Sequence, residues 1–119
     1  MMKVNVLGTE YEVVYKDYKD DSTFADRGCD GYCAEYSKKI VIGNIRTFPE
    51  HEEDTEEESK ALEKEILRHE LIHAFLNESG LSYSSLQYSS GWAKNEEMID
   101  FFAIQFPKIA KVFKELKII

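Results

Sequence analysis

The feature that most constrains the fold of this chain is a stretch over residues 56–79 that reads as one long helix. Thr55 and Glu58 form the Thr-x-x-Glu pattern of a capping box at its start, and Gly80 is a typical stop at its end. Apolar residues recur through the stretch at helical spacing, namely Ala61, Leu62, Ile66, Leu67, Leu71, Ala74 and Phe75. We therefore predict a helix from about Glu56 to Ser79, partly buried and central to the fold.

The C-terminal half of this predicted helix contains the sequence His69-Glu70-Leu71-Ile72-His73, which has the pattern HExxH. Residues four apart share one helix face, so His69 and His73 can direct two imidazoles at one metal ion. Glu70 lies beside them, where a carboxylate can take a proton from a water on the metal. Two nitrogen ligands and an adjacent base are the parts of a zinc hydrolase. Because the pattern is short, the rest of the chain must supply a third ligand.

The best candidate for that third ligand is Glu96. It opens a second segment, from about residue 94 to 106, whose apolar residues on nearly every side predict a buried helix. Asp100 follows four residues later on the same face and could accept the free N–H of a ligating histidine. Its apolar neighbours predict a buried, paired carboxylate. Glu97 is a competing ligand, because its spacing of three from Asp100 also places both on one face.

The first part of the chain reads as strands. Alternating apolar residues on either side of Gly8 predict one β-hairpin, and residues 31–36 and 39–43 predict a second. After Pro107, which ends or kinks the second helix, residues 108–117 predict a short amphipathic C-terminal helix. The expected fold is a single α+β domain over residues 1–119. An N-terminal antiparallel sheet of three or four strands would pack on the HExxH helix, followed by the ligand-bearing helix and the C-terminal helix.

Composition excludes some functions. The chain has 119 residues, a formal net charge of −8 and a pI of about 4.9, which argue against nucleic acid and anionic lipid as partners. Residues 1–6 lack the apolar core of a signal peptide, and no apolar run approaches membrane-spanning length, so we expect a cytoplasmic protein. Cys29 and Cys33 are not spaced as a CxxC motif and are expected to be reduced thiols.

The HExxH motif and the run that follows Asn95 together resemble those of a known family. The run from Asn95 to Asp100 looks like the NExx(S)D ligand helix of the gluzincins, the thermolysin-like zinc metallopeptidases. In that pattern the Glu, here Glu96, is the third zinc ligand, and the Asp, here Asp100, supports a ligating histidine. The run from Glu96 to Ala103 is also similar to the second motif of the small ImmA/IrrE-type metallopeptidases of phages, mobile elements and bacterial stress regulation. Two departures are Ile72, where many relatives have a small residue, and the absence of a helix-turn-helix segment.

The resemblance implies a zinc metallopeptidase of zincin fold that hydrolyses a peptide or protein substrate, with Glu70 as general base. The substrate would add as a strand to a sheet edge, and residues 31–42, including Ile40, Val41 and Ile42, are the expected edge. An oxyanion stabiliser is also expected, and the candidates are Tyr36, His51, Tyr83 and Tyr88. The alternative is a catalytically silent zincin-fold protein of phage or mobile-element origin that regulates by binding a partner.

Overall fold

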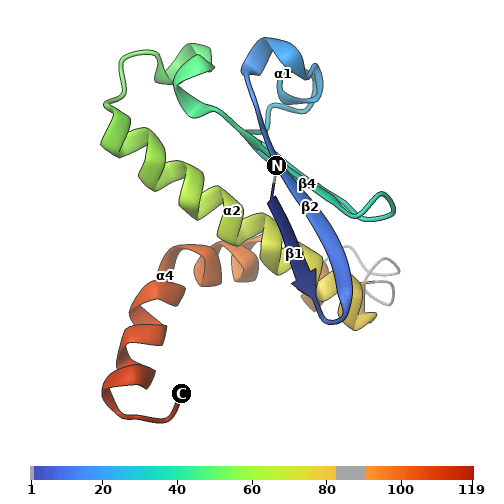
Figure 1. Ribbon diagram of the computed structural model, residues 1–119, viewed down its shortest axis with the longest axis vertical. Helices are drawn as coiled ribbons and strands as arrows, with labels where there is room; N and C mark the ends of the chain where they lie inside the picture. Colours follow the sequence, from blue (N-terminus) through green and yellow to red (C-terminus); the bar gives the residue numbers. More distant parts are fainter. Residues whose placement is uncertain (1, 83–90) are drawn as a thin grey trace.

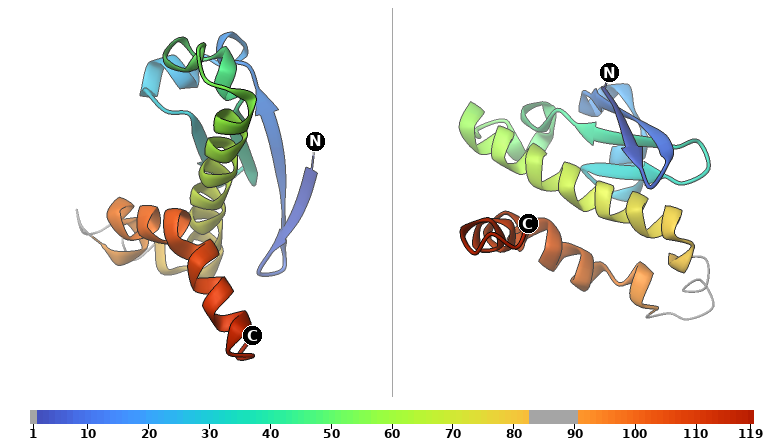
Figure 2. Two further views of the ribbon diagram at one scale, coloured as in Figure 1. Left: turned by 90° about the vertical axis from the view of Figure 1, so that its left-hand side faces the viewer. Right: turned by 60° about the horizontal axis from the view of Figure 1, so that its bottom comes forward.

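The computed structural model describes residues 2–82 and 91–119 and has the predicted α+β class. Its described strands form one sheet that packs on the long helix α2 (Glu56–Ser79), and helix α4 (Glu96–Glu115) lies on the other side of α2 (Figure 1, Figure 2). No helix in the described ranges has both the length and the apolar character needed to cross a membrane. The other described elements are β1 (Met2–Val6), β2 (Thr9–Lys16), η1 (Tyr18–Asp20), α1 (Thr23–Arg27), β3 (Gly31–Ala34), β4 (Lys39–Gly43), η2 (Ile45–Thr47), η3 (Pro49–His51) and η4 (Trp92–Lys94).

Both predicted hairpins are present. β1 pairs antiparallel with β2, and Val6 lies opposite Thr9 across a two-residue turn. Both turn residues have positive φ, 51° at Leu7 and 93° at Gly8, as a type I′ turn requires. β3 pairs antiparallel with β4, with Cys33 opposite Ile40. The period-two alternation of apolar residues therefore predicted these local pairings correctly.

The sheet is mixed, and the expectation of a purely antiparallel sheet is wrong. The strand order is β1-β2-β4-β3, and β2 runs parallel to β4, with Val13 opposite Ile40. After β2 the chain passes through α1 to the outer edge of the sheet, forms β3 there, and returns in β4 between β2 and β3. The run from Ile40 to Ile42 therefore lies in an inner strand, fully buried, and cannot be the open edge. β3 is the edge strand on that side.

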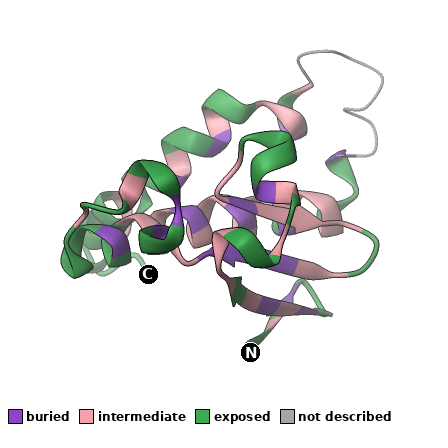
Figure 3. Cartoon of the chain, turned by 90° about the horizontal axis from the view of Figure 1, so that it is seen from above, coloured by how far each residue is buried: buried purple, intermediate pink, exposed green. Residues whose placement is uncertain are grey.

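The core lies on both faces of the sheet. Alternate residues of β4 point to opposite faces, so Ile40 and Ile42 pack toward α2 while Val41 packs against Phe24 and Phe48. The cluster on the α2 side contains Val6, Tyr11, Val13, Ile40, Ile42, Ile45, Ile66 and Ala74. Burial is concentrated along the strands and the helix surface that meets them, whereas the chain near the C-terminus is mostly exposed (Figure 3). This core fixes α2 across the sheet.

Helix α2 begins and ends where the sequence predicted. The Thr55 Oγ1 atom accepts the Glu58 N–H at 3.1 Å, and the Glu58 Oε1 atom accepts the Thr55 N–H at 3.0 Å. Gly80 closes the helix in the left-handed region at a φ of 85°. The buried residues follow helical spacing along one face, and they are Ser59, Glu63, Ile66, Glu70 and Ala74. Glu70 therefore points toward the sheet.

Helix α4 differs from the prediction in two respects. It continues through Pro107 to Glu115, so a separate C-terminal helix is wrong, and Figure 1 shows the helix changing direction along its length. It is also far less buried than its composition suggested. Its buried residues are Ile99 and Ala103, whereas about half of the Phe101 side chain is exposed, 53 %. The reason is that α4 packs mainly on α2, which covers one side of it.

Candidate metal centre

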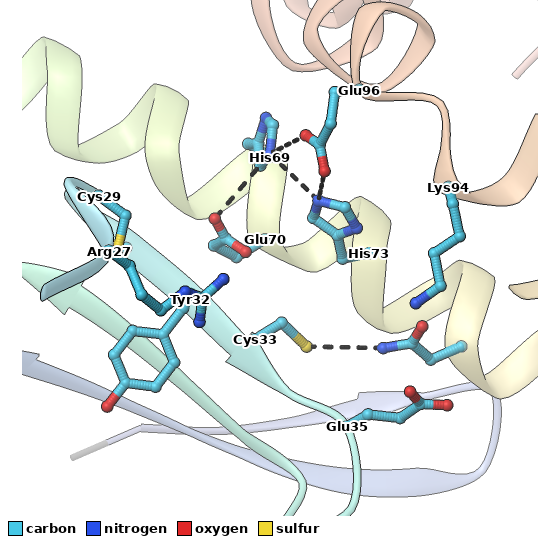
Figure 4. Close-up of a pocket in the computed structure, with 12 residues that line it drawn as sticks. Arg27, Cys29, Tyr32, Cys33, Glu35, His69, Glu70, His73, Lys94 and Glu96 are labelled. Atoms are coloured by element: carbon cyan, nitrogen blue, oxygen red, sulfur yellow. Dashed lines mark hydrogen bonds and ion pairs between the residues drawn. The ribbon is translucent and has the colours of Figure 1, made fainter. Parts of the chain in front are cut away.

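Three side chains from two helices converge on one point. His69 and His73 lie one turn apart on α2, and their Nε2 atoms are 3.2 Å apart. Glu96 is the first residue of α4, where the Asn95 side chain caps the helix by accepting the Met98 N–H at 2.7 Å. The Glu96 Oε2 atom lies 3.1 Å from Nε2 of His69, and its Oε1 atom lies 3.1 Å from Nε2 of His73 (Figure 4). Each imidazole nitrogen thus faces its own carboxylate oxygen.

These separations suit a tetrahedral metal ion. Ligand atoms at about 2.0–2.1 Å from a zinc ion lie roughly 3.3 Å from one another. The distance between the two Nε2 atoms, and the distance of each Nε2 atom from its own Glu96 oxygen, are close to this value. Glu70 belongs to the same cluster, because the ligand atoms of His69, Glu70 and His73 all lie within 4.8 Å of one another. This cluster could hold a metal ion.

Asp100 orients one of the two imidazoles. Its Oδ1 atom lies 2.9 Å from Nδ1 of His69, one turn along α4 from Glu96. A carboxylate this close to Nδ1 favours a proton on that atom, which would leave the lone pair of the ring on Nε2, the atom that faces Glu96 and His73. The prediction that Asp100 is buried is wrong, since 59 % of its side chain is exposed. Asp100 is paired as predicted, but its partner is His69 and the pairing occurs at an exposed position.

The structure distinguishes the two glutamates that sequence spacing left as alternatives. Glu96 contacts both imidazoles, whereas Glu97 is exposed and forms no ion pair with a described residue. Burial lowers the pKa of His73, although the Glu96 carboxylate opposes this shift. Burial therefore favours the neutral imidazole, which is the form that binds metals.

Glu70 is buried, and its carboxylate forms no hydrogen bond with the described part of the chain. Glu63, on the same helix face, is held by the backbone N–H of Ile45, which donates to its Oε2 atom at 3.0 Å. The nearest charged partner of Glu70 is Nε2 of His69, at 4.0 Å from its Oε2 atom. Burial raises the pKa of Glu70 to about 7, opposed by His69 and reinforced by Glu96 and by Asp30. The carboxylate is thus positioned beside the cluster and available for proton transfer.

The cluster lies where two cavities of about 360 Å³ and about 420 Å³ meet. Both are lined by Cys29, Gly31, His69 and Glu70, so together they form one groove between the edge strand β3 and helices α2 and α4. Gly31 permits this arrangement, because a Cβ atom there would lie 2.6 Å from Cγ2 of Ile66 and 3.2 Å from the carbonyl oxygen of Val41. The close approach of β3 to α2 places the sheet edge beside Glu70.

The predicted oxyanion stabilisers are not brought to the cluster by the described structure. Tyr36 is 86 % exposed in the turn after β3, and His51 pairs with Asp54 at 2.7 Å beside a different cavity. Tyr83 and Tyr88 lie outside the described residues. Neither Tyr36 nor His51 lines the groove at the metal cluster.

Sequence reasoning missed two cationic side chains of the groove, Arg27 and Lys94. Arg27 ends α1 and lies over the ring of Tyr32, at 5.9 Å from the ring centroid. Lys94 ends η4, two positions before Glu96, and that proximity in sequence was the one available signal for it. Cys29 and Cys33 are free thiols, as expected, and burial raises the pKa of Cys33 to about 12. Cys33 is therefore a neutral thiol rather than a nucleophile.

Comparisons with protein-family models, curated proteins and solved structures give no significant match for this chain.

Proposed function

We propose that this protein is a zinc-dependent metallopeptidase with a zincin-like site. The observation that carries the proposal is the convergence of His69, His73 and Glu96, with the carboxylate of Glu70 beside them and not hydrogen-bonded to the described structure. Two imidazoles and one carboxylate are the donor set of a catalytic zinc site that keeps a fourth position open. The Asp100 carboxylate, 2.9 Å from Nδ1 of His69, is the kind of partner that a ligating histidine usually has.

In this proposal each residue has a distinct task. His69, His73 and Glu96 would hold the zinc ion, and Asp100 would keep the lone pair of His69 on Nε2. The bound ion would polarise the scissile carbonyl and lower the pKa of a water. Glu70 would accept a proton from that water and pass it to the leaving amine. Burial raises the pKa of Glu70 to about 7, and a value near neutral pH suits a group that must both accept and release a proton.

The edge strand β3 is the proposed place for the substrate backbone. Among the described strands, β3 pairs only with β4, so its outer backbone groups face the groove. An extended peptide added to this edge would run past His69 and Glu70, because both line the same cavities as Gly31. Within the range 31–42 that the sequence indicated, β3 rather than residues 40–42 would therefore hold the substrate.

The test is the Glu70→Gln variant. The wild-type protein should bind about one zinc ion and cleave members of a random peptide library, and Glu70→Gln should reduce kcat/KM by at least about 10²-fold while zinc content is unchanged. Glu97→Gln is a matched control on the exposed side of α4 and should retain activity. Full activity of the Glu70→Gln protein would show that the proposed mechanism is wrong.

A specific observation favours a second candidate, an interaction protein without turnover. An apolar cavity of about 430 Å³ opens between α2 and α4, lined by Arg68, Leu71, Ile72, Phe75, Leu76, Phe102 and Phe106. Exposed apolar surface of this kind often marks a binding site for a partner. If this function is the right one, the wild-type protein would bind zinc without cleaving any library member, and a cellular phenotype would tolerate Glu70→Gln.

A further inference from the structure

We infer that the groove binds polypeptide segments that carry an acidic side chain on one side of the metal centre. The preferred side is the part of the groove between β3 and the C-terminal end of α2, where Arg27 and Lys94 lie. As a statement about the substrate, the inference rests on the proposed function. As a statement about binding, it can be tested without turnover.

With a divalent cation at the proposed metal centre, the two halves of the groove would have opposite charge. The half that contains Arg27 and Lys94 also contains Glu70 and Glu96, but these two carboxylates belong to the metal centre, where a divalent cation would balance them. That leaves two cations against one further acid, Glu35. The other half is lined by the acids Asp30, Glu65 and Asp100 and by no described lysine or arginine.

Neither cation has an ion-pair partner among residues 2–82 and 91–119. The net charge of the protein is −8, with 23 acidic against 15 basic residues, yet no described carboxylate lies within 4.0 Å of Arg27 or Lys94. Residues 83–90 contain no Asp or Glu, so they cannot supply a side-chain partner either. Both side chains extend into the pocket from opposite sides, as Figure 4 shows. Two unpaired cations in a groove of an acidic protein form a site for a carboxylate.

The other half of the groove disfavours the same side chain. Asp30 and Glu65 would repel a carboxylate there, while Leu62, Ile66, Ala103 and Ile104 provide an apolar wall. A bound segment would therefore have an acidic residue on the Lys94 side and an apolar or basic residue on the Leu62 side. Each charged contact in a solvent-accessible groove changes affinity by roughly three- to fivefold, so the preference should be about tenfold for both cations together.

The experiment measures binding and cleavage separately. Zinc-loaded Glu70→Gln protein is titrated by fluorescence anisotropy with a library of extended labelled peptides in which each position is Glu, Gln or Lys in turn. We expect about tenfold tighter binding when one position has Glu rather than Lys, and reversal of this preference in proteins that also have Arg27→Glu or Lys94→Glu. Lys111→Glu, on the exposed part of α4, is the matched control and should leave the preference unchanged. The same library is then cleaved with the wild-type protein.

The outcomes separate the inference from the proposed function. Equal binding of the Glu and Lys peptides, no binding of any peptide, or a preference that survives both charge reversals would overturn the inference, whether or not the wild-type protein cleaves. A preference for Glu that the reversals invert supports the inference. If that preference is found but the wild-type protein cleaves nothing, the proposed peptidase function is wrong and the groove is a binding site for acidic segments.

Discussion

At the scale of single residues, the state of His69 depends on a carboxylate on another helix. The Oδ1 atom of Asp100 lies 2.9 Å from Nδ1 of His69, and a carboxylate there favours the tautomer whose lone pair faces Glu96. Asp100 is largely exposed, so its removal should leave the fold intact. We therefore expect it to contribute to the proposed metal site rather than to the core.

We predict that Asp100→Ala lowers zinc affinity about 10- to 100-fold, because His69 loses the partner that holds its tautomer. Competition with a chromogenic chelator measures this affinity directly. Glu97→Gln removes a neighbouring exposed carboxylate and serves as the control for a general charge effect. Equal zinc affinity of the Asp100→Ala and wild-type proteins would show that Asp100 does not contribute to zinc binding.

A second residue pair, Asp21 and Tyr32, ties the edge strand to the loop that precedes it. The Tyr32 hydroxyl donates to Oδ2 of Asp21 at 2.5 Å, and this bond is the main reason that the pKa of Asp21 is held well below its usual range. Burial, and then the same bond, raise the pKa of Tyr32 to about 12, so the phenol remains a donor across the acidic and neutral range.

The stability that Asp21 contributes should therefore depend on pH. Because the folded protein has the lower pKa, this contribution is fully present above the unfolded value of about 4 and is lost as the pH falls toward the folded value. Tyr32→Phe should lower the unfolding free energy by about 1 kcal/mol at pH 7, and the difference from wild type should shrink below about pH 4. Urea unfolding at pH 7, 4 and 2.5 measures this. Tyr36→Phe, in an exposed turn, is the control, and a constant difference at all three pH values would contradict the prediction.

At the scale of elements, the continuation of α4 through Pro107 has a specific cause. Proline has no N–H, so the Ala103 carbonyl four residues earlier lacks its helical donor. Arg68 of α2 supplies one, because its Nε atom donates to the Ala103 carbonyl oxygen. Ala103 is buried, so this oxygen would otherwise lose a hydrogen bond in a largely dry environment. The same contact fastens α4 to α2 close to the metal centre.

We predict that Arg68→Met lowers the unfolding free energy by about 1–3 kcal/mol, since a buried carbonyl loses its donor while the aliphatic stem is retained. Pro107→Ala restores a backbone N–H to that carbonyl. The double variant should therefore be less destabilised than the sum of the single variants, which a double-mutant cycle by chemical denaturation would show. Lys64→Met, on an exposed position of α2, controls for loss of a surface charge. Additive effects would mean that Arg68 does not compensate for Pro107.

At the scale of the whole molecule, the groove is made by elements that are distant in sequence. α1 contributes Arg27, β3 contributes the edge, α2 contributes the histidines, and η4 with α4 contributes Lys94 and Glu96. The net charge of −8 describes the whole surface and gives no indication that two unpaired cations meet in this groove. The inferred charge polarity along the groove thus depends on how these elements assemble.

Features that depend on neighbours a few residues apart could be predicted from the sequence. The Thr55 capping box and Gly80 set the ends of α2, the spacing of four put His69 and His73 on one face, and period-two alternation produced the hairpins. These features depend on local hydrogen bonds and on helix or strand periodicity, and such interactions are encoded in short stretches.

Tertiary structure alone decided the rest, because it depends on which distant surfaces pack together. The parallel pairing of β2 with β4 buried residues 40–42 and made β3 the edge. The packing of α4 on α2 turned Glu96 rather than Glu97 toward the imidazoles and left Asp100 exposed but 2.9 Å from His69. It also brought Arg68 to the carbonyl that Pro107 leaves without a donor. The candidate metal ligands could thus be identified from the sequence, whereas long-range packing determines which of them lie close together.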